Sequence, residues 1–156
     1  MRVHVIAVGR LRAGPEKDLV DDYLNRFDRT GRALGLGPAR VIEVEERRGA
    51  GMAGEAQLLR RSVPAGAVLV ALDERGRVES SPDFANRLAS WRDQGRGDLA
   101  VMIGGADGID PALRDEADFG LSLGKMVWPH MLVRVMLAEQ LYRAASILAG
   151  SPYHRA

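Results

Sequence analysis

The chain has 156 residues, 46% of them hydrophobic and 28% charged, which is typical of one globular domain with a substantial core. A net charge of +1 gives no general attraction for nucleic acid, and the absence of cysteine excludes disulfides and thiolate metal sites. The sequence contains neither an apolar run of about eighteen residues nor a signal peptide. We therefore expect a cytoplasmic enzyme or binding protein with no membrane partner.

Strands and helices are predicted to alternate along the chain. The apolar runs predicted to be strands are Arg2–Val8, Arg40–Val44, Ala67–Leu72, Leu99–Ile103 and Phe119–Leu123. Helical patterns begin at Pro15, at Glu55 (ending at Arg61), at Ser81-Pro82 with Ser81 as the cap, after Asp110-Pro111, and at Pro129 (ending at Ala149). Glu45–Gly54 is predicted to be a polar loop and Asp73–Gly76 a turn. This alternation predicts a single α/β domain over residues 1–156, with a largely parallel sheet flanked by helices.

Three strand ends are candidate ligand sites, because parallel sheets bind ligands beyond the carboxyl ends of their strands. They are Leu72-Asp73, Gly104-Gly105 and Leu123-Gly124. The glycines of IGGADG, residues 103–108, would let backbone N–H groups approach a ligand, or would merely form tight turns. This motif is neither the GxGxxG fingerprint nor a phosphate loop ending in GK[ST], which disfavours a dinucleotide-dependent oxidoreductase.

The stretch GLSLGKMVWPHMLVR, residues 120–134, is the strongest candidate site. It contains Lys125, one of only two lysines among 22 basic residues. His130 and Arg134 are four residues apart and are expected to share one face of a helix near its N-terminus. This combination suits an uncharged flat heterocycle beside an anionic group. The structural alternatives are a surface role for His130, a core role for Trp128 and a turn-supporting role for Asp107.

The last helix and the C-terminal tail suggest a subunit interface. The helix is apolar on more than one side, which indicates either deep burial or half of an interface, and we favour a homodimer. Its apolar residues are Val133, Met136, Leu137, Leu141, Ala144, Ile147 and Leu148. The tail SPYHRA places Tyr153, His154 and Arg155 together, which combines a stacking ring, a titrating ring and a group that binds phosphate.

Several segments resemble the RlmH family of SPOUT-superfamily methyltransferases, which act on large-subunit ribosomal RNA. They are AVGR near the start, LDERG, IGGADG, LSLGKMVWPHMLVRVMLAEQLYRA and the terminal SPYHR. The resemblance implies S-adenosylmethionine-dependent methylation at N3 of a pseudouridine, in a 23S rRNA stem-loop at the ribosomal subunit interface. It also implies a homodimer and a C-terminal deep trefoil knot.

Two groups of site residues follow from the resemblance together with the motifs. The predicted cofactor-binding residues are Leu72, Gly104, Gly105, Leu123, Gly124, Lys125, Met126, Val127 and Trp128. The predicted catalytic residues are His130, Arg134, Asp107, Tyr153, His154 and Arg155. Methyl transfer requires loss of the N3 proton, to His130 or to Asp107 through water, while Arg134 could stabilise the developing anion. No metal and no DNA partner are expected.

The tail is predicted to reach a neighbouring subunit. The helix that begins near His130 is about 30 Å long, and the connector after it is too short to return along it. Tyr153–Arg155 would therefore complete the active site of the partner in a dimer. The alternative to an enzyme is a non-catalytic RNA- or nucleotide-binding module that uses the same loops.

Overall fold

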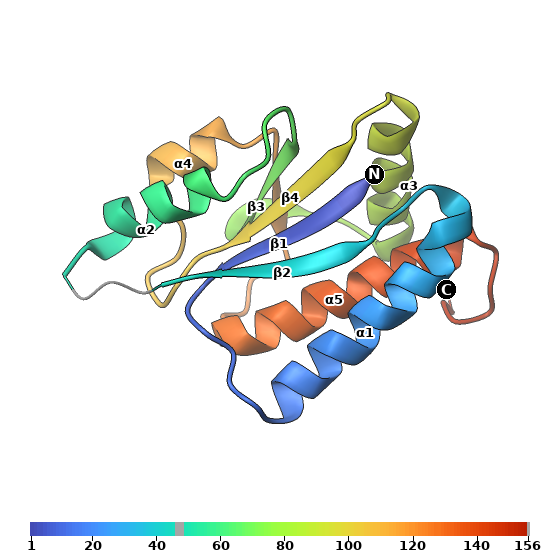
Figure 1. The fold of residues 1–156 in the computed structure, drawn as a ribbon, viewed down its shortest axis with the longest axis horizontal. Helices are drawn as coiled ribbons and strands as arrows, with labels where there is room; N and C mark the ends of the chain where they lie inside the picture. Colours follow the sequence, from blue (N-terminus) through green and yellow to red (C-terminus); the bar gives the residue numbers. More distant parts are fainter. Residues whose placement is uncertain (46–48, 156) are drawn as a thin grey trace.

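A five-stranded sheet forms the centre of the computed structural model, which describes residues 1–45 and 49–155. The strand order is β2-β1-β4-β3-β5, and each pair of neighbours is parallel (Figure 1). The strands are β1 (Arg2–Val8), β2 (Ala39–Val44), β3 (Val68–Val78), β4 (Asp98–Ile103) and β5 (Phe119–Ser122). The predicted parallel α/β sheet is therefore confirmed, while the trefoil knot stays a prediction.

Helices cover both faces of this sheet (Figure 1). The helices are α1 (Pro15–Gly31), the short 3-10 helix η1 (Arg32–Leu34), α2 (Gly51–Arg61), α3 (Ser81–Asp93), α4 (Pro111–Glu116) and α5 (His130–Leu148). Side chains alternate between the faces, so that Val3 and Val5 of β1 join the core under α1 and α5, whereas Ile6 joins the core under α2 and α4. Because both faces are buried, the central strands are continuous apolar runs instead of alternating ones.

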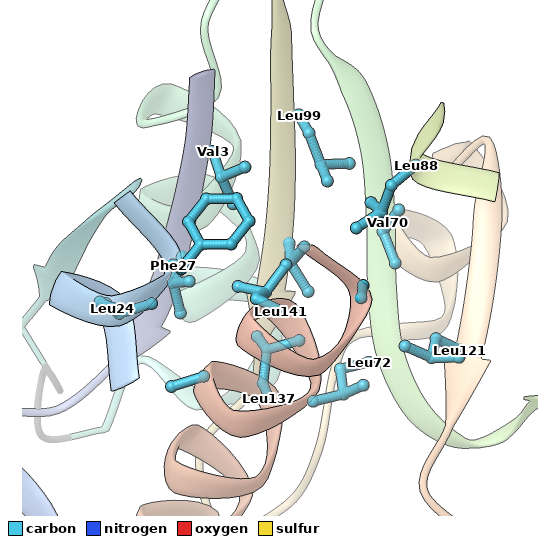
Figure 2. Close-up of a cluster of buried hydrophobic side chains, with 14 of the residues drawn as sticks. Val3, Leu24, Phe27, Val70, Leu72, Leu88, Leu99, Leu121, Leu137 and Leu141 are labelled. Carbon is cyan, nitrogen blue, oxygen red and sulfur yellow. The ribbon is translucent and has the colours of Figure 1, made fainter. Parts of the chain in front are cut away.

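α5 lies on the sheet between α1 and α3, which explains most of its broad apolar surface. Figure 2 shows Leu137 and Leu141 of α5 in one cluster with Leu24 and Phe27 of α1. Leu137 and Leu141 are fully buried inside their own chain, so these residues are not half of a subunit interface. The apolar width of α5 reflects its central position in the fold, and only its first turn has large exposed apolar side chains.

The predicted starts of two helices, α2 and α3, are wrong. α2 begins at Gly51, inside the segment Glu45–Gly54 that was predicted to be a loop, and residues 46–48 of that segment lie outside the described residues. α3 is capped by Ser80 and not by Ser81, because the Ser80 hydroxyl accepts a 3.2 Å hydrogen bond from the backbone N–H of Asp83.

β3 continues well beyond the predicted end at Leu72. Leu72 and Arg77 both pair with Leu121 of β5, so residues 73–76 leave the ladder as a bulge and the strand then resumes. At Gly76 the two backbones almost touch, since a Cβ atom there would lie 2.6 Å from the carbonyl carbon of Gly120. The predicted turn is therefore a bulge within one longer strand, closed by a glycine at which any added side chain must displace the backbone of β5.

We predict that Gly76→Ala destabilises the fold, because the added methyl group must displace the backbone of β5. The expected cost is about 2 kcal/mol, which lowers the melting temperature by about 4–8 °C in a domain of this size. Gly97→Ala is the control, since a Cβ at Gly97 has no atom within 4 Å. Equal melting temperatures for the two variants, measured by circular dichroism, would contradict the close approach.

Candidate functional site

The carboxyl ends of β4, β3 and β5 surround a cavity of about 280 Å³, near the lower end of the range for small-molecule sites. The three loops that follow or interrupt these strands line it, with Val133 of α5. The lining residues are Leu72, Asp73, Glu74, Arg75, Gly105, Ala106, Asp107, Gly108, Leu123, Gly124, Met126, Val127, Trp128 and Val133. The three predicted strand ends therefore meet at one cavity, while their role as a ligand site stays a prediction.

A second cavity, of about 430 Å³, lies between α1, α5 and the start of α3 and is bordered mainly by apolar side chains. It has none of the residues of the 104–108 loop, and it shares only Leu123 and Gly124 with the first cavity. Backbone groups that can approach a polar ligand gather at the strand-end cavity, which is therefore the better candidate site.

In the loop after β4, the two adjacent glycines have different surroundings. Gly104 is buried outside the cavity lining, and a Cβ there would lie 2.5 Å from the backbone of Gly108. Gly105 lines the cavity, and its carbonyl accepts a 3.0 Å hydrogen bond from the N–H of Gly108. Gly104 is thus required by the loop itself, whereas Gly105, Asp107 and Gly108 face the space in which a ligand would lie.

In the loop after β5, the backbone is positioned by Ser122. Its hydroxyl accepts a hydrogen bond from the N–H of Gly124 and donates one to the carbonyl of the same residue, both at 3.1 Å. Gly124 has a φ of 114°, a conformation that favours glycine. Every residue from Leu123 to Trp128 lines the cavity except Lys125, which is exposed. The contact of Lys125 with a ligand stays a prediction.

The bulge in β3 contributes residues that sequence analysis did not single out, Glu74 and Arg75, next to Asp73. The Asp73 carboxylate is 5% exposed, accepts a hydrogen bond from the N–H of Arg75 and lies 3.7 Å from Nη1 of Arg114. It therefore fixes the shape of the bulge. The LDERG segment was visible in the sequence, but only pairing with β5 places its charged residues on the cavity.

Arg134 does not face the cavity, which corrects the prediction that it acts beside His130. Its side chain is 2% exposed, and its guanidinium donates to Glu43 at 2.9 Å and to the carbonyls of Val8 and Gly9 at 2.8 Å. Burial lowers the pKa of Arg134, and the Glu43 carboxylate opposes that shift. The side chain thus ties α5 to the ends of β1 and β2. His130, half-buried at the first residue of α5, also lies outside the cavity lining.

The tail folds back over the second half of α5. Tyr153 donates a 3.0 Å hydrogen bond to Glu139, and its ring lies 4.6 Å from that of Tyr142. Burial, reinforced by the hydrogen bond to Glu139, raises the pKa of Tyr153 to about 12, so the phenol is neutral at physiological pH. Nδ1 of His154 lies 3.2 Å from Nη1 of Arg143. Because arginine only donates, Nδ1 must accept, which leaves the proton of a neutral ring on Nε2.

The predicted catalytic residues therefore fall in two separate places within one chain. The tail returns along α5 as far as Glu139, nine residues after His130, which corresponds to about 14 Å along the helix axis. The prediction that the connector is too short to return along the helix is therefore wrong. Tyr153 and His154 contact the second half of α5, whereas Asp107 lies at the cavity. That the tail completes the site of a partner stays a prediction.

Glycine-rich loops around a cavity at the carboxyl edge of a parallel sheet define a small-molecule site of the α/β type. The sequence matches the model of one protein family over residues 1–154. The chain belongs to this family, which is described as predicted SPOUT methyltransferases.

The chain is 81% identical over 155 residues to the ribosomal RNA large subunit methyltransferase H of Roseobacter denitrificans, with 99% of each protein covered. It is 76% identical over 155 residues to the protein of the same name from Ruegeria pomeroyi, again with 99% of each covered. Among solved structures, a probable methylase family protein from Haemophilus influenzae Rd KW20 aligns with a TM-score of 0.52 at 9% identity. That alignment covers 99% of this chain and 70% of the other, and it supports the fold alone.

Within the described part of the chain, no helix is long and apolar enough to cross a membrane. The same residues contain no group of three or more histidine, aspartate or glutamate side chains arranged to hold a metal ion. Neither search covers residues 46–48 or 156.

We predict that Arg134→Lys lowers the free energy of unfolding by about 2 kcal/mol, because one ammonium group cannot bridge a carboxylate and two carbonyls that a guanidinium reaches together. Urea denaturation measures the effect. Arg26→Lys is the control, since Arg26 forms an exposed pair with Asp22 on α1 and should change stability by less than about 0.5 kcal/mol. A loss no larger than the control would contradict the structural role of Arg134.

Proposed function

We propose that this protein is an S-adenosylmethionine-dependent methyltransferase that modifies N3 of a pseudouridine in 23S rRNA, in the stem-loop at the ribosomal subunit interface. The observation that carries the proposal is the glycine-rich cavity at the strand ends, in a chain that belongs to a methyltransferase family. The full-length similarity to proteins named ribosomal RNA large subunit methyltransferase H supports the choice of RNA. We place the activity in the cytoplasm, where ribosomes are found.

The residues of the cavity fit the proposed cofactor. Leu72, Leu123 and Trp128 offer apolar surface for an adenine ring, and Gly105 and Gly108 leave backbone groups accessible. The lining has the carboxylates of Asp73, Glu74 and Asp107, and the buried Asp73 lies near the guanidinium groups of Arg75 and Arg114. The remaining surplus of one carboxylate favours a positively charged sulfonium. When bound, the cofactor supplies an electrophilic methyl group, and the protein must supply position and a proton acceptor.

Of the two predicted bases, Asp107 is the better placed. Its exposed carboxylate lines the cavity, whereas His130 lies outside the lining. We assign Asp107 the N3 proton of the target base, taken directly or through one water molecule. Glu43 and the carbonyls of Val8 and Gly9 hold the Arg134 guanidinium, so stabilisation of the developing anion falls to other groups.

We further propose that the active protein is a homodimer. Five large apolar side chains are exposed near the cavity, and we call them the apolar patch: Met126, Val127, Trp128, Met131 and Leu132. Met126 and Val127 are 72% and 84% exposed, which is costly for a free surface and typical of an interface. A partner packed on this patch brings a second α5 close to the cavity. Its tail, with Tyr153 and Arg155, would then reach the RNA held there.

The proposed reaction is tested with methyl-labelled S-adenosylmethionine and 70S ribosomes from cells that lack the modification. We expect label in 23S rRNA, at a single pseudouridine. Ala106→Trp places a large ring on the cavity lining and should weaken cofactor binding at least about tenfold in calorimetry, with methylation reduced in parallel. Ala112→Trp is the control, because Ala112 is exposed on α4 away from the lining.

Two results would redirect the proposal. Cofactor binding without any transfer to ribosomes, large subunits or free rRNA would favour the non-catalytic binding module. Normal cofactor affinity in a folded Ala106→Trp protein would place the cofactor outside this cavity.

The dimer is tested with Leu132→Arg, which puts a charge in the apolar patch. If the patch is buried between subunits, the dissociation constant should rise roughly a hundredfold, equivalent to about 3 kcal/mol. Sedimentation velocity measures it, with Gln57→Arg on the exposed surface of α2 as the control. Wild-type protein that sediments as a monomer at micromolar concentration would contradict the dimer.

A further inference from the structure

We infer that the loop between β1 and α1, residues 9–14, binds backbone phosphates of the RNA through Arg10 and Arg12, beside the site of methyl transfer. The inference extends the proposed function, because it specifies how the same edge of the sheet would hold the RNA whose base enters the cavity. Three observations carry it: the position of the loop, the burial of Leu11 within it, and two arginines that have no side-chain partner among residues 1–45 and 49–155.

The loop lies at the same edge of the sheet as the methyl-transfer cavity. In the register of the sheet, Ala7 of β1 is opposite Ile103 of β4, so Gly9 and Gly104 follow neighbouring strands. The loop borders a wide, open cavity of about 1000 Å³ lined by Gly9, Arg10, Leu11, Arg12, Ala13, Lys17, Glu43, Val44 and Glu45. Figure 1 shows the loop passing beside the start of α5, and Arg134 of that helix bonds the carbonyl of Gly9. The open cavity and the strand-end cavity share no described lining residue. An RNA strand whose base enters one cavity can therefore run across the other.

The backbone of the loop is held in place by contacts with the core and with Glu43 and Arg134. Leu11 is 8% exposed and inserts into the core, and its N–H donates to the Glu43 carboxylate. The same carboxylate accepts from Arg134, whose guanidinium also bonds the carbonyl of Gly9. Arg10 and Arg12 flank Leu11 and are exposed. Because the buried Leu11 lies between them, Arg10 and Arg12 both extend into solvent from a backbone that is already fixed. Binding of phosphate by these side chains therefore costs little backbone entropy.

The charges around the open cavity leave the guanidinium groups of Arg10 and Arg12 available to bind an anion. Within the described part of the chain, neither Arg10 nor Arg12 makes a side-chain hydrogen bond or an ion pair. Lys17 is bonded to Asp21 at 2.7 Å, and Glu43 is neutralised by Arg134. Glu45 is then the one lining carboxylate without a described partner, against two free guanidinium groups. The lining of the open cavity thus has a surplus of positive charge. This surplus is local, because the net charge of the whole chain is only +1.

Phosphate is the group that this arrangement fits best. Guanidinium forks bind phosphate oxygens in pairs and keep their charge at any physiological pH. The loop presents no aromatic ring for base stacking, so it should position the strand without reading its sequence.

The test is the salt dependence of ribosome binding by the full-length protein. The double variant Arg10→Gln/Arg12→Gln should bind 70S ribosomes roughly tenfold more weakly at low salt, measured by co-sedimentation. The slope of log affinity against log salt should become shallower by about 1.4–1.8, since each phosphate contact contributes about 0.7–0.9. Calorimetric affinity for S-adenosylmethionine should not change, because neither residue lines that cavity.

Arg32→Gln/Arg61→Gln is the matched control. It removes the same charge from exposed side chains at the opposite edge of the sheet and should leave the slope unchanged. A loop variant with the wild-type slope would overturn the inference even if methylation of 23S rRNA is confirmed. Equal slope changes in loop variant and control would also overturn it, by showing a general charge effect. If the loop variant shows the expected change in slope but the wild-type protein transfers no methyl group, the proposed reaction is refuted and the phosphate-binding loop is retained.

Discussion

The buried guanidinium of Arg134 is the contact on which the functional edge of this molecule depends. It joins the first turn of α5 to the carboxyl ends of β1 and β2 through one carboxylate and two carbonyl groups. Taking this charge out of water is costly, and the hydrogen bonds that replace its hydration exist only in one arrangement of helix and strands. The position of α5 relative to the sheet is thereby fixed, and with it one wall of the cavity and the course of the loop after β1.

The sheet itself illustrates how a fold can be predicted from sequence. Runs such as Val68–Val70 and Leu99–Ile103 are apolar at every position, which is what burial on both faces requires, and glycine or proline marks most of their ends. The parallel arrangement and the meeting of three strand ends follow from this pattern. The boundaries that failed depend on single contacts, such as the hydrogen bond from the N–H of Asp83 that makes Ser80 the cap of α3.

The site was predicted less completely, for a physical reason. Residues next to one another in the sequence, such as Leu123 and Trp128, gather at the cavity because one loop carries them. Helical spacing alone places Arg134 beside His130, and spacing does not say whether a side chain faces solvent or a carboxylate 91 residues away in sequence. Lys125 was singled out by its rarity in the sequence, a property that carries no information about direction. Of these cases, only Arg134 is decided by long-range partners.

The packing of the tail on α5 has a consequence for the populations of the free protein. Tyr153 and His154 are held by one hydrogen bond to Glu139, a contact with Arg143 and ring packing against Tyr142. Interactions of these kinds contribute about 1 kcal/mol each, and fixing each backbone residue of the tail costs about 1–2 kcal/mol, so opposing terms of similar size set the balance between docked and released tail. A surface that binds the released tail then needs only a few kcal/mol of preference to redistribute the two forms.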